Sequence, residues 1–276
     1  MPQTINTNVN SLTAQRNLNA SQMSLSTSMQ RLSSGLRVNS AKDDAAGLAI
    51  AERMNSQVKG MNVAIRNAGD AISLAQTAEG ALGAVSDALQ RMRELAVQSA
   101  NGTNSPGDRA NLDSEFSQLK NEVTRVLTGT KFNGTAVLGS AATLDFQVGA
   151  NNTANDKISV ATSNLNVGAG VSAVVAGSVS TAALSLTAID SIDTAIGEIT
   201  TVRATYGAVQ NRFESVISSL SNIAENTAAS RGRIVDADFA AETANMSRTQ
   251  VLQQAGMAMV AQANAIPNNV MQLLKG

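Results

Sequence analysis

The chain contains no histidine, no cysteine and no tryptophan among its 276 residues, and aromatic residues make up only 2% of it. Without histidine or cysteine it cannot build a Ser-His-Asp or Cys-His nucleophile, or a metal site with imidazole or thiolate ligands. We therefore expect no enzyme activity, no cofactor and no bound metal. Aromatic side chains dominate most globular cores. This core must instead consist of Leu, Ile, Val, Met and Ala, which suits long, closely packed helices.

Long apolar runs and clusters of one charge are also missing. The 20 basic and 21 acidic residues are dispersed along the chain, so we expect neither nucleic acid nor an anionic membrane as a partner. No segment approaches the roughly 18 apolar residues of a membrane span. The first residues lack the basic and apolar regions of a cleavable signal peptide. We expect no membrane insertion and, if the protein is secreted, no cleaved signal peptide.

What is present is helical periodicity interrupted by short joints. The first apolar stripe has steps of three, four or seven residues and comprises Leu18, Leu25, Met29, Leu32 and Leu36, which predicts a helix. Gly35 is expected to end it. Ser40 and Asp43 have the spacing of a capping box, and Asp43 and Asp44 would then occupy the first turn of the next helix.

The segment "RLSSGLRVNSAKDDAAGLAI", which contains this joint, has two readings. Its double aspartate suits a ligand loop, but no third ligating side chain lies near in the sequence. We therefore favour a joint between two helices, with Gly35, Arg37, Ser40, Asp43 and Asp44 as its residues.

A much longer stripe follows the joint. Its positions are Met54, Val58, Met61, Ile65, Ala68, Ile72, Ala75, Leu82, Val85, Leu89, Met92 and Ala96. They predict one helix of roughly 60 residues, a length typical of coiled coils and filaments. Asn101-Gly102 is expected to end it, and Ser105-Pro106 to start another helix that reaches Gly129.

The middle of the chain changes character. "TLDFQVGANNTANDKISV" alternates apolar and polar residues on both sides of a turn-rich segment, which predicts a β-hairpin. Residues 160–185 are mostly Ala, Ser, Val and Gly, so we expect poorly specified structure there and tolerance of deletion at 165–180. Gly168-Ala169-Gly170 weakly resembles a dinucleotide-binding fingerprint, but no helical pattern follows it, and we set that reading aside.

Helical steps resume at Leu186 and predict a helix of roughly 40 residues. Gly232 is expected to break it, and Arg231, Gly232 and Arg233 then form a second joint that mirrors the first. Asp236 and Asp238 are placed for the start of a last helix. Its expected apolar positions include Leu252, Ala255, Met259 and Ile266.

The predicted fold is mainly α: a long antiparallel helical bundle or coiled coil with a small β-hairpin insert, in which both termini are helical and lie side by side. We expect terminal helices at 1–39 and 233–276, a long-helix bundle at 40–138 and 186–232, and a hairpin with a short variable region at 139–185. Each terminal helix has only a narrow apolar stripe. Further copies of the chain are the simplest source of additional packing surface.

The ordered motifs resemble bacterial flagellin over about residues 1–150 and 184–276. The N-terminal ones are "LSSGLRVNSAKDDAAGLAI", "RNAGDAISLAQTAEGAL", "LQRMRELAVQSANG", "FNGT" and "FQVGAN". The C-terminal ones are "YGAVQNRFESVISSL", "ENTAASRGRIVDADFAAE" and "QVLQQAGMAMVAQAN". The resemblance implies a self-assembling filament subunit with a short central region, whose terminal helices form the inner filament core. It also implies extracellular localisation, unfolded export by the flagellar type III apparatus, and an export chaperone, a filament cap and hook-junction proteins as partners.

The resemblance further implies recognition by Toll-like receptor 5 through Arg91, Leu95, Gln98 and Glu115. Leu95 lies off the stripe of Leu89, Met92 and Ala96, so we expect it to be exposed and unnecessary for the monomer's core. An incidental surface leucine is the plainer alternative.

Three other functions remain open at this point. A hook–filament junction protein would share the terminal helices, although the two motifs around Arg91 and Met257 favour flagellin. A secreted helical effector or adhesin would stay monomeric. An enzyme would need a convergent site, and Asp190 with Asp193 on one helix face is equally a solvated charge pair.

Overall fold

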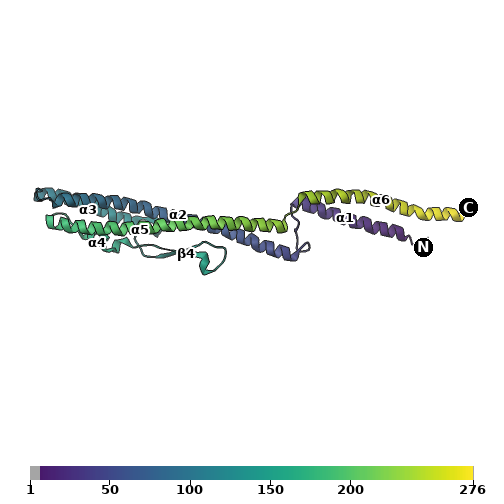
Figure 1. Ribbon diagram of the computed structural model, residues 1–276, viewed down its shortest axis with the longest axis horizontal. Helices are drawn as coiled ribbons and strands as arrows, with labels where there is room; N and C mark the ends of the chain where they lie inside the picture. The colour runs from purple at the N-terminus through teal and green to yellow at the C-terminus, as the bar shows by residue number, and fades with distance from the viewer. Residues whose placement is uncertain (1–6, 276) are drawn as a thin grey trace. The chain divides into compact units, whose positions relative to one another are not determined.

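The computed structural model describes residues 7–275, with side chains up to residue 266. Its helices are α1 (Val9–Ser34), α2 (Ala45–Ala100), α3 (Pro106–Gly129), α4 (Ala169–Ala176), α5 (Ala182–Val235) and α6 (Phe239–Lys275). Its strands are β1 (Lys131–Phe132), β2 (Thr135–Ala136), β3 (Thr143–Gln147) and β4 (Lys157–Ala161). Two short 3-10 helices are η1 (Ala154–Asp156) and η2 (Leu165–Val167). The mainly α class is confirmed (Figure 1).

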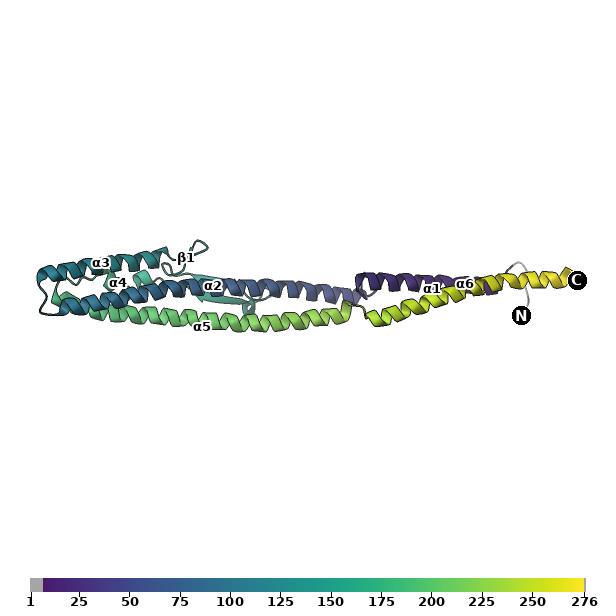
Figure 2. The same ribbon diagram turned by 90° about the horizontal axis from the view of Figure 1, so that it is seen from above.

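The chain divides into two compact units. The terminal unit contains the residues up to Ser56 and those from Asn226 on, and the central unit comprises Gln57–Glu225. In the terminal unit α1 and α6 lie side by side and antiparallel (Figures 1 and 2). Within residues 7–275, no helix is both long and apolar enough to span a bilayer.

The central unit is built around α2, with α3 and α5 packed along it (Figure 2). One exposed ion pair joins α2 to α3, and another joins α2 to α5. Arg91 of α2 bonds to Glu115 of α3, and Arg93 of α2 bonds to Asp193 of α5. The core between these helices is largely aliphatic, with Phe116, Phe213 and Tyr206 as its largest side chains. The predicted β-hairpin is confirmed as the antiparallel β3–β4 pair, with Phe146 opposite Ile158.

Most predicted helix ends are confirmed. Gly35 ends α1 in the left-handed region, at φ 72°. Ser105 and Asp108 form a capping box at α3, and Pro106 occupies its first position. The left-handed backbone at Gly35 and the fixed φ of Pro106 are the properties that these two residue types supply.

The predicted break at Gly232 is wrong. Helix α5 continues through Gly232 to Val235, because one glycine costs a helix only about 1 kcal/mol relative to alanine. The chain leaves the helix at Asp236, and the side chain of Asp238 accepts hydrogen bonds from the backbone N–H groups of Ala240 and Ala241. Asp238 thus caps the start of α6.

The prediction of poorly specified structure around 165–180 is also wrong. Val171, Val174 and Val179 are buried in the central core. Helix α4 packs so closely on α5 that a Cβ on Gly170 would lie 2.5 Å from the backbone nitrogen of Ala195. Gly170 therefore permits the close approach of α4 to α5, and the segment should not tolerate deletion.

The prediction that Leu95 is exposed is wrong as well. Its side chain is 1% exposed and belongs to the main hydrophobic core. The apolar periodicity of the sequence predicted only one buried stripe on α2. Because α3 and α5 both pack on this part of α2, the buried arc widens to include Leu95 and Ser99.

We expect Leu95→Ala to lower the free energy of unfolding of the monomer by about 2–5 kcal/mol, because it removes buried methyl groups and leaves a cavity. Val97→Ala, at a side chain that is 51% exposed, should change it by less than about 0.5 kcal/mol. Denaturant unfolding followed by circular dichroism measures both. Equal effects of the two substitutions would contradict the placement of Leu95.

Gly170→Ala should destabilise the central unit by about 1–3 kcal/mol, because the new methyl group forces α4 away from α5. Gly197→Ala is the matched control, since a Cβ at that helical position meets nothing within 4 Å. The control should be neutral or stabilising by up to about 1 kcal/mol. Thermal unfolding of both variants tests the close approach, and a stabilised Gly170→Ala protein would rule it out.

Candidate functional site

The contact between α1 and α6 follows a coiled-coil spacing. Inward positions recur at alternating intervals of three and four residues, and every one of them is buried or half-buried. On α1 they are Ser11, Ala14, Leu18, Ser21, Leu25, Ser28 and Leu32, and on α6 Glu242, Met246, Thr249, Gln253, Gly256, Val260 and Ala263. Most of these side chains are small or polar. The seam therefore brings the helices close together but buries little apolar surface.

Polar contacts along this seam fix its register. The amide of Asn8 donates to the carbonyl of Ala263 at 2.7 Å, and the hydroxyl of Ser11 donates to the side-chain oxygen of Asn264 at 2.7 Å. At the other end Arg31 lies 3.7 Å from the nearly buried Glu242. Buried polar positions in a coiled coil specify register at a cost in stability. The pairing is thus specific but weakly stabilised.

The apolar stripes predicted for the terminal helices are only partly correct. Leu18, Leu25 and Leu32 face the seam, but Met29 is exposed. On α6 the predicted stripe of Leu252, Ala255, Met259 and Ile266 is exposed throughout. Large apolar residues were assigned to the helix contact because such residues usually form it. Here glycine, alanine and serine occupy many of the contact positions beside these leucines, and the regular spacing of the small residues was the signal that sequence reasoning missed.

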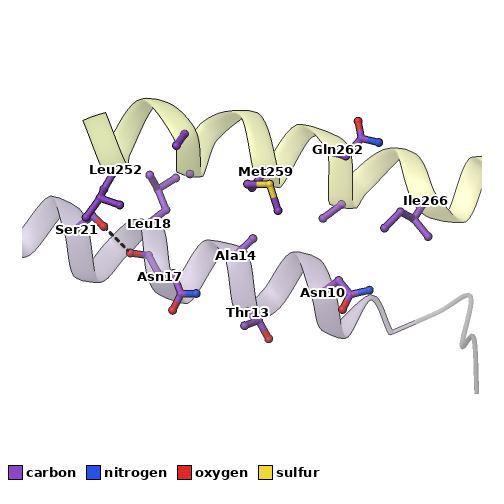
Figure 3. Close-up of a pocket in the computed structure, with 13 residues that line it drawn as sticks. Asn10, Thr13, Ala14, Asn17, Leu18, Ser21, Leu252, Met259, Gln262 and Ile266 are labelled. Atoms are coloured by element: carbon purple, nitrogen blue, oxygen red, sulfur yellow. Dashed lines mark hydrogen bonds between the residues drawn. The ribbon is translucent and has the colours of Figure 1, made fainter. Parts of the chain in front are cut away.

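The exposed stripe of α6 forms one wall of a groove along the helix pair (Figure 3). The groove has a volume of about 500 Å³. Leu252, Met259 and Ile266 line it from α6, and Leu18 and Ala14 line it from α1. Its edge carries the amide side chains of Asn10, Asn17 and Gln262. An apolar floor with amide groups at the edge suits another helix better than a small charged ligand.

Exposed apolar side chains are not confined to the groove. On α1 they are Val9, Leu12, Met23 and Met29, and on α6 Phe239, Val251, Leu252, Met257, Met259 and Ile266. Extended apolar exposure of this kind marks a protein interaction surface. We call these residues together the terminal apolar surface.

The two predicted joints contact each other. The backbone N–H of Arg37 donates to the carbonyl of Val235 at 2.7 Å, and that of Ala237 donates to the carbonyl of Gly35 at 2.9 Å. The guanidinium of Arg37 also donates to the carbonyl of Ile234. The segments that leave α1 and α5 are therefore held together by main-chain hydrogen bonds.

The remaining basic residues of the second joint lie within the last turns of α5. Arg233 donates to the hydroxyl of Ser230 at 2.9 Å. Arg231 is half-buried, and its Nε has no hydrogen-bond partner among the described residues. Gly232 lies close to Asp236, whose carboxylate oxygen would be 2.9 Å from a Cβ there.

Asp43 and Asp44 both form hydrogen bonds within the first joint, but in other positions than predicted. Asp43 accepts hydrogen bonds from the backbone N–H groups of Ser40 and Asn39, which lower the pKa of its carboxyl group. It closes a turn before the helix. Asp44 caps α2 instead, since its side chain accepts from the N–H of Gly47 at 2.8 Å. Both aspartates therefore precede the first turn of α2 rather than lying in it.

Because the pKa of Asp43 is lowered, its protonation weakens this turn only at acidic pH. A carboxyl group whose pKa falls on folding stabilises the fold above its unfolded pKa. That contribution disappears only as the pH drops below the ordinary value of 3.8 and through the folded pKa. The turn therefore keeps its charge-assisted hydrogen bonds at neutral pH.

Of the four predicted receptor contacts, the structure brings Arg91 and Glu115 together. The guanidinium donates to the Glu115 carboxylate at 2.8 and 3.0 Å, and to that of Glu94 at 2.8 Å. The two acids, Glu94 first, raise the pKa of Arg91. Gln98 is exposed two turns further along α2. Leu95 lies between them in the sequence but points into the core.

The two residue patterns that resembled catalytic or nucleotide sites have structural partners. Asp193 forms a two-bond ion pair with Arg93, which lowers the pKa of its carboxyl group. The carboxylate of Glu198 on α5 accepts hydrogen bonds from the N–H groups of Gly170 and Val171 at the start of α4. That carboxylate occupies the position that a phosphate would need.

Comparison with known proteins agrees with the arrangement of helices. Residues 5–143 match the bacterial flagellin N-terminal helical region, and residues 189–274 match the C-terminal helical region. Flagellin of Halalkalibacterium halodurans is 44% identical over 272 residues, covering 98% of this chain and 99% of that protein. Flagellin of Xenorhabdus nematophila is 42% identical over 315 residues, covering both chains completely.

Two solved structures are similar to this chain. The crystal structure of Bacillus cereus flagellin is 33% identical, with a TM-score of 0.51, and covers 60% of this chain and 94% of its own. A putative flagellar hook-associated protein from Vibrio parahaemolyticus has a TM-score of 0.57 at 14% identity, covering 70% of this chain and all of its own. The second similarity concerns the fold alone.

The matches to both helical regions and the near-complete coverage of two flagellins fix the class of protein, which is structural rather than enzymatic. This chain belongs to the bacterial flagellin family and is a structural subunit of the flagellar filament.

Proposed function

We propose that other copies of the chain cover the terminal apolar surface in the filament. The carrying observation is the arrangement of α1 and α6, which places small and polar residues in their mutual seam and leaves Leu12, Leu252 and Met259 exposed. Burying a side chain of this size contributes about 1.5–3 kcal/mol. Several such side chains per subunit supply the apolar contact that the α1–α6 seam lacks.

This proposal assigns roles to the predicted regions. Residues 1–39 and 233–276 form the inner core of the filament, and 40–138 with 186–232 form the helical layer around it. Residues 139–185 add a short outer region that has no separate large domain. The buried core of the central unit supports this division, because that unit has no comparable deficit of apolar packing.

Leu252→Asp should slow filament growth from added seeds at least about tenfold, because it places a carboxylate in an apolar groove without a partner. Since Leu252 is about half exposed in the monomer, monomer unfolding should be unchanged. Electron microscopy and sedimentation of the polymer measure growth, and circular dichroism monitors the monomer.

Gln254→Asp is the matched control for this experiment. It adds the same charge to the same helix at an exposed polar position outside the groove, and should slow growth much less. Growth of Leu252→Asp at the unmodified rate would show that the groove is not covered in the filament.

Export as an unfolded chain through the flagellar type III apparatus fits a seam with few apolar contacts. Such a helix pair separates readily, and an export chaperone is proposed to hold the terminal helices apart. The filament cap and hook-junction proteins are proposed as further partners at the filament ends. They would meet the same terminal apolar surface before another subunit covers it.

Recognition by Toll-like receptor 5 is proposed for the exposed stripe of α2 and α3. Arg91, Gln98 and Glu115 are accessible there, and arginine is enriched among residues that dominate binding energy. Leu95 is retained only as a buried support beneath the stripe, because its side chain is not available to a partner.

Arg91→Ala should lower receptor activation by monomer at least about tenfold, as expected for a central arginine contact. Arg93→Ala is the control, because Arg93 is similarly exposed on the same helix but pairs with α5. A cell reporter assay with monomer compares the two variants. Equal loss in both would indicate a general effect on α2 rather than a receptor contact at Arg91.

A further inference from the structure

Among the methionines whose side chains the structure describes, the exposed ones lie on the two terminal helices. Met23 and Met29 on α1 and Met257 and Met259 on α6 are 51–67% exposed. In the central unit Met61 and Met92 are buried, at 6% and 0% exposure. The terminal helices therefore present methionine side chains to solvent, together with exposed aliphatic residues such as Leu12 and Leu252.

A methionine thioether is apolar, flexible and polarisable, so it adapts well to an apolar contact. It is also open to oxidation by peroxides. The sulfur lone pair attacks one peroxide oxygen, the O–O bond breaks, and the other oxygen leaves as water after taking a proton. The product is a sulfoxide, in which sulfur has lost two electrons and carries a polar oxygen.

We propose that Met23, Met29, Met257 and Met259 form an oxidation-sensitive site that controls entry of the subunit into the filament. A peroxide-class oxidant converts them to sulfoxides in the free subunit, and the oxidised subunit no longer assembles. In the filament the same side chains are covered and resist the oxidant. This inference rests on the proposed covering of the terminal apolar surface.

The surroundings of Met259 show why a sulfoxide would interfere. Met259 lies on the groove between Leu252 and Ile266 (Figure 3), and Ala255 lines the groove beside them. None of these three side chains donates a hydrogen bond. A polar group buried without a partner is unfavourable. The sulfoxide oxygen would lose its hydration when another helix covers the groove.

Oxidation at these positions should spare the folded monomer. None of the four is a seam position, although Met259 lines the groove beside the seam, and none belongs to the central core. The seam methionine Met246 is half-buried, and Met61 and Met92 are shielded. A modest dose of oxidant therefore separates loss of assembly from loss of folding.

The experiment treats monomer and preformed filaments with the same dose of hydrogen peroxide and maps sulfoxides by peptide mass spectrometry. In monomer the four exposed methionines should oxidise before Met61 and Met92, and in filaments they should be protected. Growth of oxidised monomer from seeds should fall at least about tenfold, because a sulfoxide oxygen loses its hydration when another subunit covers the apolar part of this surface. The unfolding transition of the central unit should stay unchanged, and methionine sulfoxide reductases should restore growth.

A variant with leucine at all four positions is the matched control, and its growth should resist peroxide. If that variant fails to grow before treatment, the comparison of oxidised with reductase-repaired native protein decides the question. Normal growth of monomer fully oxidised at the four positions overturns the inference. So does loss of growth, after oxidation, in the leucine variant to the same extent as in the native chain.

The Leu252→Asp experiment separates this inference from the proposed function. If Leu252→Asp blocks growth and oxidation does not, the surface is an interface but its methionines are not a control site. If neither change affects growth, the interface itself is misplaced.

Discussion

The rest of the structure depends on the seam between α1 and α6, which is specific in register but poor in apolar contacts. Ser11, Ser28 and Gly256 allow close approach, and Asn8 and Glu242 provide polar contacts toward its two ends. The seam partly buries Leu18, Leu25 and Leu32 but leaves Leu12, Leu252 and Met259 exposed. These exposed residues are the ones that we propose other copies of the chain cover.

The central unit buries its large apolar side chains within one chain. Phe116, Phe213 and Tyr206 are buried in its core, and Phe146 of the hairpin packs edge-on against Phe213 with ring centroids 5.6 Å apart. Its Gly170 brings α4 onto the backbone of α5, whereas a Cβ on Gly256 would first meet the Leu18 side chain, at 3.2 Å. In the central unit, however, large side chains fill the space beside the close contact, and this unit can fold before assembly.

The sequence predicted helix positions better than helix faces. Periodicity and end signals such as Gly35 and Ser105-Pro106 are local, so they placed α1, α2, α3 and the β3–β4 hairpin correctly. Which face is buried depends on how many neighbours a helix has. Leu95 was misplaced because two helices pack on α2 there, and residues 165–180 because small residues looked unstructured when their partner α5 was unknown. The short β1–β2 hairpin was also missed, although Asn133-Gly134 carries its turn signal, with both residues at positive φ.

The buried faces of the terminal helices were misassigned for a related reason, although the need for further copies of the chain was expected. Hydrophobic patterning assigns the largest apolar residues to the contact within a chain, and in a monomer that rule is usually sound. In a filament subunit the contacts between chains compete for the same residues. A stripe with helical spacing, here Leu252, Met259 and Ile266, is typical of residues that are buried against another helix. The sequence alone does not show whether that helix belongs to the same chain or to another copy. The exposure of this stripe beside a seam of serine, glycine and alanine indicates that the partner is outside the folded monomer, and this makes stability of the terminal unit a property of the assembly.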